Sequence, residues 1–201
     1  MTGEITVQPP LRSICVYCGS SKGNRPDYLE GAQSLGRLLA ESRIRLVYGG
    51  GSIGLMGSMA GACLDAGGQV TGIIPHFLDR LEVGMEGLTE IEKTESMHER
   101  KQRMAELSDG FVVMPGGLGT LDETFEILTW RQLQLHDKPI VLLNIAGYWD
   151  LFVHLLEHQV NEGFVKPAHL DLFQVVDTPE QVIPALARQP ADRGDIRSKW
   201  T

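Results

Sequence analysis

The most constraining feature of this sequence is a short apolar run that ends in glycines and passes directly into a helical pattern. Residues 111–114 (FVVM) suit a buried parallel strand, because such strands read as continuous apolar stretches. A proline and a Gly-Gly-x-Gly sequence end the run, and glycines permit a tight turn in which backbone N–H groups approach a ligand closely. A helical pattern begins at Thr120. The junction therefore predicts a helix N-terminus whose free N–H groups and dipole favour an anion such as phosphate.

Thr120 and Glu123 also have a purely structural interpretation. A Thr-x-x-Glu sequence before an apolar run is typical of a capping box, with Thr120 as the N-cap and Glu123 at position N3. Spacing alone does not separate capping from catalysis. A cap does not require several glycines in front of it, whereas a phosphate-binding turn does. The glycines therefore favour a ligand site.

Length and charge limit the class of protein. A chain of 201 residues is typical of a single domain that can bury a sizeable core. The net charge of −8 and the isoelectric point of about 5.2 argue against a general nucleic-acid binder, which presents a basic face. The sequence contains no apolar run that could span a bilayer, and its first residues lack the apolar core of a signal peptide. We therefore expect a cytoplasmic protein that does not contact membranes.

The cysteines predict neither a metal site nor a disulfide. Cys15 and Cys18 form a C-x-x-C sequence inside an apparent strand, where side chains three positions apart point to opposite faces. Cys63 lies in a helical segment of small residues. We expect all three to be small, buried apolar side chains. No other cluster has the spacing of metal ligands, and we predict no metal and no cofactor.

Apolar runs and helical patterns alternate along the chain. This alternation predicts an α/β fold: a Rossmann-like, doubly wound parallel sheet in a three-layer α/β/α arrangement. We expect one domain over residues 12–187, with flexible tails at residues 1–11 and 188–201. The predicted strands cover residues 13–17, 45–48, 69–75, 111–114, 139–143 and 172–176, and the predicted helices cover residues 27–42, 56–66, 96–107, 149–161 and 179–187 besides the one from residue 120. Residues 76–94 are less regular and suggest a lid or pocket rim.

Two further turns follow predicted strands. Gly19 and Ser20 lie at the carboxyl end of the first strand, the edge where ligands bind in open α/β sheets, although a simple loop has the same composition. The sequence GGGSIGLMG after the second strand contains G-x-G-x-x-G, but the next strand does not end in the acidic residue of a dinucleotide site. We predict that Gly50 and Gly51 face phosphate or ribose without binding NAD. Close packing of helix 56–66 on the sheet is the alternative, and both can hold.

The helix predicted over residues 96–107 places two cations among apolar side chains. Arg100 and Lys101 fall within the inward stripe that includes Met104. A buried charge is costly unless it is paired. In one interpretation, the aliphatic parts of both side chains are buried and their charged ends reach solvent. In the other, Arg100 faces Glu123 or an anionic ligand, for which a flat guanidinium is suited. We favour the second interpretation for Arg100 and leave both open for Lys101.

Three motifs, in this order, resemble those of the LONELY GUY (LOG) family. They are GGG at residues 49–51, MHERK at residues 97–101 and PGGLGTLDE at residues 115–123, the last matching the family's PGGxGTxxE. The resemblance extends over residues 12–187. It implies a Rossmann-like homodimer that hydrolyses the N-glycosidic bond of a nucleoside 5′-monophosphate, either AMP or the N6-modified AMP of cytokinin ribotides, to free base and ribose 5-phosphate. Many members carry an older lysine decarboxylase label.

The resemblance also implies roles for matching residues. Arg100 and Glu123 match the catalytic pair of the family. Cleavage of a glycosidic bond develops positive charge on the ribose. Glu123 could hold the ribose hydroxyls, offset this charge or activate water, while the permanently charged Arg100 would position the substrate and support the leaving base. The predicted substrate- and phosphate-binding residues are Glu82, Lys101, Gly116, Gly117, Leu118, Gly119, Thr120, Leu121 and Asp122, together with the turn residues Gly19, Ser20, Gly50 and Gly51.

Two other functions compete with hydrolysis. A Rossmann-like carrier of nucleotides or of a nucleotide-bearing cofactor would use the glycines equally well, but it would leave the Arg100 and Glu123 pair without a role. A pyridoxal phosphate decarboxylase would need a Schiff-base lysine and a partner for the pyridinium nitrogen. No lysine of this sequence has a convincing setting for that chemistry.

Overall fold

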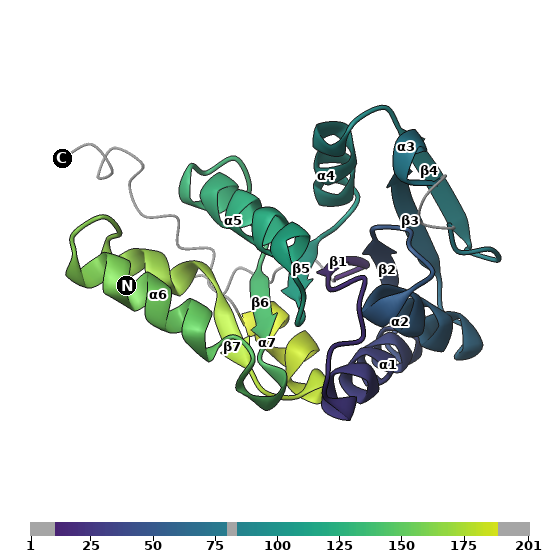
Figure 1. Ribbon diagram of the computed structural model, residues 1–201, viewed down its shortest axis with the longest axis horizontal. Coiled ribbons are helices and arrows are strands. Elements are labelled where there is room, and N and C mark those ends of the chain that lie inside the picture. Colours follow the sequence, from purple (N-terminus) through teal and green to yellow (C-terminus); the bar gives the residue numbers. More distant parts are fainter. Residues whose placement is uncertain (1–10, 80–83, 189–201) are drawn as a thin grey trace, which may run out of the picture.

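The computed structural model describes residues 11–79 and 84–188 of the chain. Its centre is a single sheet of seven strands, and every neighbouring pair is parallel (Figure 1). The predicted parallel sheet is confirmed. In chain order the strands are β1 (Ser13–Tyr17), β2 (Arg45–Tyr48), β3 (Val70–Pro75), β4 (Glu90–Thr94), β5 (Gly110–Val113), β6 (Ile140–Leu143) and β7 (Gln174–Val176).

Helices connect the strands and cover both faces of the sheet. Across the described residues, no helix is both long enough and apolar enough to cross a bilayer. The α-helices are α1 (Pro26–Glu41), α2 (Gly54–Asp65), α3 (His76–Asp79), α4 (Met97–Glu106), α5 (Leu118–Gln132), α6 (Asp150–Asn161) and α7 (Val182–Arg188), and short 3₁₀ turns lie at η1 (Ile145–Gly147), η2 (Pro167–Leu172) and η3 (Pro179–Gln181).

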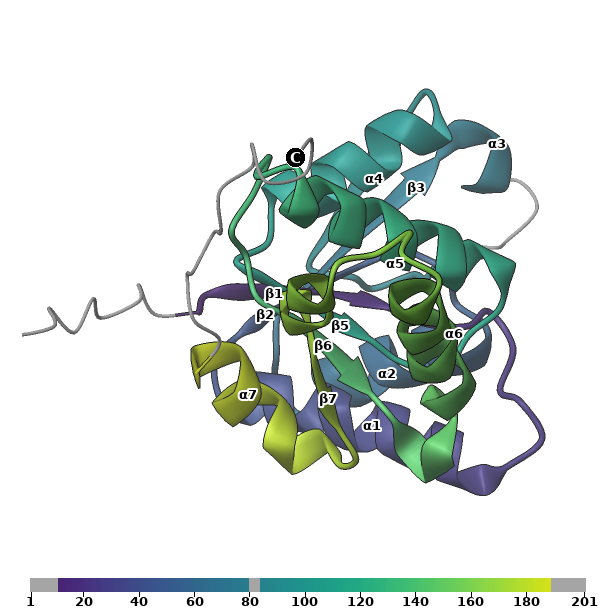
Figure 2. The ribbon, with the colours of Figure 1, turned by 90° about the vertical axis from the view of Figure 1, so that its left-hand side faces the viewer.

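Alternating side chains of the central strands divide the core into two layers. Val112 points into the cluster that α1, α2 and α7 complete, whereas Phe111 and Val113 point into the cluster completed by α4, α5 and α6. Figure 2 shows α1, α2 and α7 below the sheet and α4 and α5 above it. Both faces of a parallel sheet are thus buried, which explains why its strands read as continuous apolar runs. The predicted three-layer arrangement is confirmed.

The buried cysteines follow this division. Cys15 packs in the layer of α4, α5 and α6, while Cys18 packs in the opposite layer. Both thiols and that of Cys63 are free and buried, as predicted. Burial raises the pKa of the Cys63 thiol to about 11, so it stays a neutral, small side chain.

The segment predicted as an irregular rim contains an edge strand. β4 pairs in parallel with β3, and most of its side chains are charged or exposed. Glu92 of β4 accepts two hydrogen bonds from Arg103 of α4, at 2.6 and 3.1 Å. An edge strand needs no continuous apolar run, because one side of it faces solvent, and this is why the pattern concealed it. Glu82, the predicted binding residue of this segment, lies outside the described residues.

The strand order places a switch in winding direction at the centre of the sheet. The order is β4-β3-β2-β1-β5-β6-β7, so the chain builds outward from β1 to one edge and then returns to β5 to build toward the other. The connections that follow β1 and β5 therefore leave the sheet toward opposite faces, and a crevice opens between them. In open α/β sheets, this crevice at the carboxyl ends of the strands is where ligands bind.

Candidate active site

A cavity of about 220 Å³ lies at this switch point, between the turns after β1 and β5. The two turns are joined directly, since the N–H of Gly19 donates to the carbonyl of Pro115 at 3.0 Å. Segments that are far apart in the sequence thus form one wall. Residues that line the cavity include Gly19, Ser20, Gly49, Arg100, Gly117, Leu118, Gly119, Thr120 and Glu123.

The N-terminus of α5 opens into the cavity. The helix begins at Leu118, its N-cap is Gly117, and no side chain caps it. In the described part of the chain, the N–H groups of Gly117, Leu118, Gly119 and Thr120 donate to no protein acceptor, whereas Leu121 already donates to the Gly117 carbonyl at 3.0 Å. Free N–H groups at the positive end of a helix dipole form a seat for an anion such as phosphate.

The predicted capping box is wrong. Thr120 is the third residue of α5 rather than its N-cap, and Glu123 lies one further turn along the helix. Glycine has no Cβ and tolerates the N-cap position, so the helix begins three residues earlier than the Thr-x-x-Glu pattern suggests. Glu123 therefore has no role as a helix cap.

Gly116 is required by close packing, whereas the two glycines after it are not. A Cβ at Gly116 would lie 2.1 Å from Thr120 Oγ1 and 2.9 Å from Gly19 N. A Cβ at Gly117 or Gly119 would meet nothing within 4 Å in the described structure. Space is thus left beside these two glycines, where a ligand can approach the backbone.

The second glycine turn serves mainly to pack α2 against the first turn. The N–H groups of Leu55 and Met56, at the start of α2, donate to the Gly19 carbonyl at 3.1 and 3.4 Å. A Cβ at Gly54 would lie 2.2 Å from the carbonyl carbon of Ser20. This geometry supports the packing alternative, because the N-terminus of α2 is already occupied by a backbone oxygen.

Gly50 and Gly51, the predicted contacts of this turn, do not line the cavity. Gly49 does, and its carbonyl accepts a hydrogen bond from Arg100. Gly50 instead has a positive φ of 79°, and its carbonyl accepts a hydrogen bond from the N–H of Met85 at 3.2 Å. The turn thus contributes to the site through its first glycine.

Arg100 is buried and is oriented by the backbone of the sheet. Its Nε donates to the carbonyl of Ile73 and its Nη2 to the carbonyl of Gly49, both at 3.0 Å. Only 8% of its side-chain surface is exposed, so the guanidinium does not reach bulk solvent. α4 begins at the N-cap Ser96, whose hydroxyl accepts the N–H of Glu99 at 3.1 Å. This cap fixes the first turn of the helix that carries Arg100.

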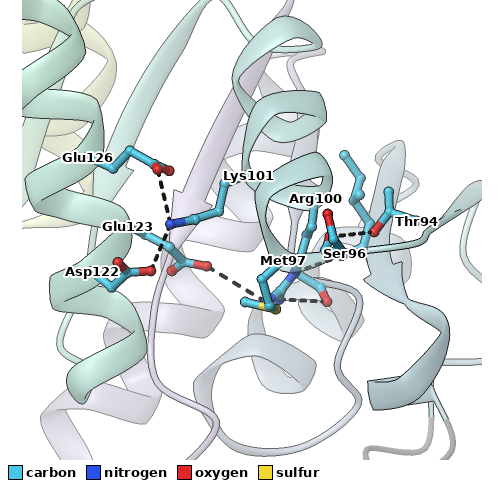
Figure 3. Close-up of polar contacts among 10 residues, drawn as sticks. Thr94, Ser96, Met97, Arg100, Lys101, Asp122, Glu123 and Glu126 are labelled. Atoms are coloured by element: carbon cyan, nitrogen blue, oxygen red, sulfur yellow. Dashed lines mark hydrogen bonds and ion pairs between the residues drawn. The ribbon is translucent and has the colours of Figure 1, made fainter.

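Glu123 faces Arg100 across the cavity (Figure 3). Its Oε1 lies 4.0 Å from Arg100 Nη1, and 11% of its side-chain surface is exposed. Burial raises the pKa of Glu123 to about 7, although the Arg100 charge opposes the rise. Both the ionised and the protonated carboxyl are therefore populated near neutral pH, which suits a group that acts on charge or protons.

Lys101 lies beside this pair but binds carboxylates of α5 instead of lining the cavity. Its Nζ is 3.0 Å from Asp122 Oδ2 and 3.1 Å from Glu126 Oε1 (Figure 3). Burial alone would lower the pKa of Lys101, but hydrogen bonds to Asp122 and Glu126 outweigh it and raise that pKa. The ammonium therefore stays charged and joins α4 to α5. Glu126 carries no sequence motif and was not predicted.

The remaining wall of the cavity is apolar and consists mainly of methionine side chains. Met56, Leu78, Met97 and Met104 contribute to it from α2, α3 and α4. The sequence pattern of α4 predicted that Met104 faces inward, but only as a core residue. Methionine adapts its shape to irregular partners, so this wall can receive a flat, largely apolar group such as a nucleobase. Leu121, Lys101, Asp122 and Gly116 complete the predicted set and lie next to the cavity without lining it.

The fold and this site define a Rossmann-like α/β protein with an anion seat next to a buried Arg–Glu pair. Residues 56–186 match a protein family described as possible lysine decarboxylase. A cytokinin riboside 5′-monophosphate phosphoribohydrolase of Arabidopsis thaliana, LOG5, is 42% identical over 196 residues, which cover 96% of this chain and 86% of that protein. The enzyme of the same name from Rhodococcoides fascians is 46% identical over 168 residues, covering 83% and 85%. The chain therefore belongs to the LOG family.

Solved structures of proteins with other described roles share the fold. The Moco carrier protein of Chlamydomonas reinhardtii has a TM-score of 0.65 at 22% identity, covering 93% of this chain and 98% of that one. The molybdenum cofactor binding protein of Rippkaea orientalis has a TM-score of 0.64 at 22% identity, covering 94% and 97%. At such identities the likeness concerns the fold alone.

Proposed function

We propose that this protein hydrolyses the N-glycosidic bond of nucleoside 5′-monophosphates, releasing the free base and ribose 5-phosphate. The substrates are AMP or N6-modified AMP of the cytokinin ribotide type, as the names of its relatives indicate. One observation carries the proposal: the buried Arg100 and Glu123 lie 4.0 Å apart in the same cavity as the free N–H groups at the start of α5. A carrier would need the anion seat but not this pair.

In this proposal, different residues contact the phosphate, the ribose and the base of the substrate. The N-terminus of α5 holds the 5′-phosphate through backbone N–H groups. As the C1′–N bond breaks, its electron pair moves to the base and positive charge develops on the ribose, which the ionised Glu123 stabilises. Arg100 offers positive charge for the electron density that reaches the base. Water then supplies the hydroxyl to C1′, and its proton goes to the departing base.

The proposal includes a homodimer that works in the cytoplasm. Apolar side chains are exposed on α5, on α6 and on the segment that follows α6, and pairing two copies would cover them. Exposed fractions are 39% for Phe125, 81% for Leu151, 44% for Leu155 and 87% for Phe164. Three free, buried thiols fit a reducing compartment. Light scattering at micromolar concentration tests the dimer, and a monomer mass would contradict it.

The decisive experiment separates an enzyme from a carrier. Pure protein is incubated with AMP, N6-isopentenyl-AMP, GMP, CMP and UMP without added metal or cofactor, and the released base is followed by chromatography. We expect free base from AMP or its N6-modified form. Tight binding of a monophosphate without any free base would replace the proposed enzyme by a carrier. Adenosine serves as the matched control, because loss of the phosphate removes the contact with α5 and lowers kcat/KM.

A further inference from the structure

A tyrosine outside the family motifs reaches the glycine turn of the site. Tyr148 follows β6 and η1, at the same carboxyl edge of the sheet as the cavity. Its hydroxyl donates to the carbonyl oxygen of Gly116. Tyr148 does not line the cavity, and 38% of its surface is exposed. Any effect of Tyr148 on a ligand must therefore act through the turn that it contacts.

The hydrogen bond fixes the direction of one peptide unit. In a planar trans peptide, the carbonyl oxygen and the following N–H point in opposite directions. The Gly116 carbonyl points to Tyr148, so the N–H of Gly117 points the other way. Gly117 lines the cavity whereas Gly116 does not, which agrees with an N–H directed at the ligand.

A peptide between two glycines needs such a restraint. Without side chains, both flanking residues rotate with little steric resistance. If the Gly116–Gly117 peptide turned over, a carbonyl oxygen would replace an N–H in the anion seat and would repel a phosphate. Gly116 itself cannot be replaced by a stiffer residue, because a Cβ there would lie 2.1 Å from Thr120 Oγ1. The restraint therefore has to come from another part of the chain.

The loop that carries Tyr148 is held firmly. The Tyr148 ring packs edge-on against Tyr28, at 5.6 Å and 81°, and against Trp149, at 4.9 Å and 89°. Asn144 accepts the N–H of Trp149 at 2.6 Å and donates to Asp150 at 2.8 Å.

The same loop contains backbone strain. Ala146 adopts a left-handed conformation, with φ 55° and ψ 31°, which is unfavourable for a residue with a Cβ. Strained backbone persists where its surroundings fix it, and such places cluster at functional sites. The strained turn brings the chain from β6 to Tyr148, opposite the glycine turn.

We infer that Tyr148 is a positioning residue that holds the Gly116–Gly117 peptide with its N–H toward the 5′-phosphate of the substrate. The identity of the phosphate ligand rests on the proposed function. The contact between Tyr148 and Gly116 does not, and the experiment below keeps the two apart.

The test measures phosphate binding without turnover. Ribose 5-phosphate, the proposed product, is titrated by calorimetry into the wild-type protein, Tyr148→Phe and Tyr28→Phe. Tyr148→Phe keeps the ring and removes only the hydroxyl, so we expect Kd to rise about tenfold through loss of one oriented hydrogen bond. Tyr28→Phe makes the same chemical change on the neighbouring ring and should leave Kd within about twofold of the wild type. Equal Kd values for the wild type and Tyr148→Phe overturn the inference, as does a wild type that does not bind ribose 5-phosphate.

Kinetics distinguishes positioning from a general structural role. With AMP, Tyr148→Phe should raise KM by the same factor as Kd while kcat is kept. A fall in kcat at unchanged KM, or a lower melting temperature with unchanged Kd, overturns the inference. If the wild type binds ribose 5-phosphate but releases no base from any nucleotide, the proposed function fails while the calorimetric comparison still decides the role of Tyr148.

Discussion

Arg100 approaches Glu123 to 4.0 Å, yet its orientation does not depend on that carboxylate. Two of its nitrogens donate to the carbonyls of Ile73 and Gly49 at 3.0 Å each, and the third faces Glu123. The cation is thus placed by the sheet before a substrate arrives. We therefore expect the guanidinium to stay in place when Glu123 is changed, so a Glu123 variant tests the carboxylate without moving Arg100.

Glu123→Gln should abolish most of the turnover while it preserves binding. The substitution keeps the shape of the side chain but removes the charge that meets the developing ribose cation, so kcat should fall by about 100-fold or more. The proposed phosphate seat consists of backbone N–H groups, so AMP should bind with a similar Kd. Single-turnover kinetics and calorimetry measure the two quantities. The control is Glu106→Gln, the same change at an exposed carboxylate that pairs with Arg103; a fully active Glu123→Gln would refute the catalytic role.

Arg100→Ala should lose stability as well as activity. It leaves two buried carbonyls without their donor and Glu123 without its cation, which should lower the free energy of unfolding by about 2–5 kcal/mol. Urea unfolding measures this loss, and Arg103→Ala on the outer face of α4 should cost less than about 1 kcal/mol. In activity, the double variant with Glu123→Gln should be little worse than the worse single variant, since the two residues act as a unit. Additive losses would show that they act independently.

The raised pKa of Glu123 makes stability depend on pH. Burial raises this pKa from 4.5 to about 7, so the folded chain holds the proton more tightly than the unfolded chain. Stability from the protonated carboxyl is present below pH 4.5 and is lost as the pH rises through about 7. Relative to Glu123→Gln, the wild type should lose up to about 3 kcal/mol between pH 4.5 and pH 8. A stability difference that is the same at both pH values would contradict the raised pKa.

The ionisation of Glu123 should also appear in the pH dependence of kcat/KM. If the carboxylate is the active form, kcat/KM for AMP rises with an apparent pKa of about 7 and levels off above it. The phosphate of the substrate also titrates, near pH 6. Binding of AMP to Glu123→Gln over the same pH range isolates the phosphate contribution.

Lys101→Met tests whether Lys101 contacts the substrate or organises the site. The ammonium neutralises Asp122 and Glu126, and both of these carboxylates raise the pKa of Glu123, whereas the Lys101 charge lowers it. Its removal should shift the pKa in the rate profile upward and should lower kcat at neutral pH, with little change in KM. Lys93→Met, at the partly exposed pair with Asp79 outside the cavity, is the matched control. An increase in KM with an unchanged pH profile would instead support the substrate contact that the family resemblance implies.

Most of the architecture was readable from the sequence, because strands buried on both faces require apolar runs. β1 and β2 begin and end at the predicted residues. β4 could not be read in this way, since an edge strand carries charges that pair with neighbours such as Arg103 and Arg45. Patterns along one strand do not reveal partners that only the tertiary structure supplies.

Site residues could be predicted from the sequence where a charged residue falls at a position that the helical pattern assigns to the apolar face. Arg100 stood out because a cation was placed within an apolar stripe, and the structure buries it. Glu126 and Tyr148 were missed because one glutamate on a helix, or one tyrosine in a loop, forms no sequence pattern that distinguishes a site residue from a surface residue. The function of the second glycine turn was also undecided, since glycines that approach a ligand and glycines that pack against backbone look the same in a sequence.

The occupation of the α2 N-terminus by the Gly19 carbonyl has a consequence for ligand size. A dinucleotide or a nucleoside triphosphate brings more than one charged phosphate and needs a place for each. At the start of α5 the first N–H groups are free within the described structure, whereas at the start of α2 those of Leu55 and Met56 already bind a backbone oxygen. We therefore expect the protein to prefer ligands with a single terminal phosphate, because its own main chain fills the neighbouring helix N-terminus.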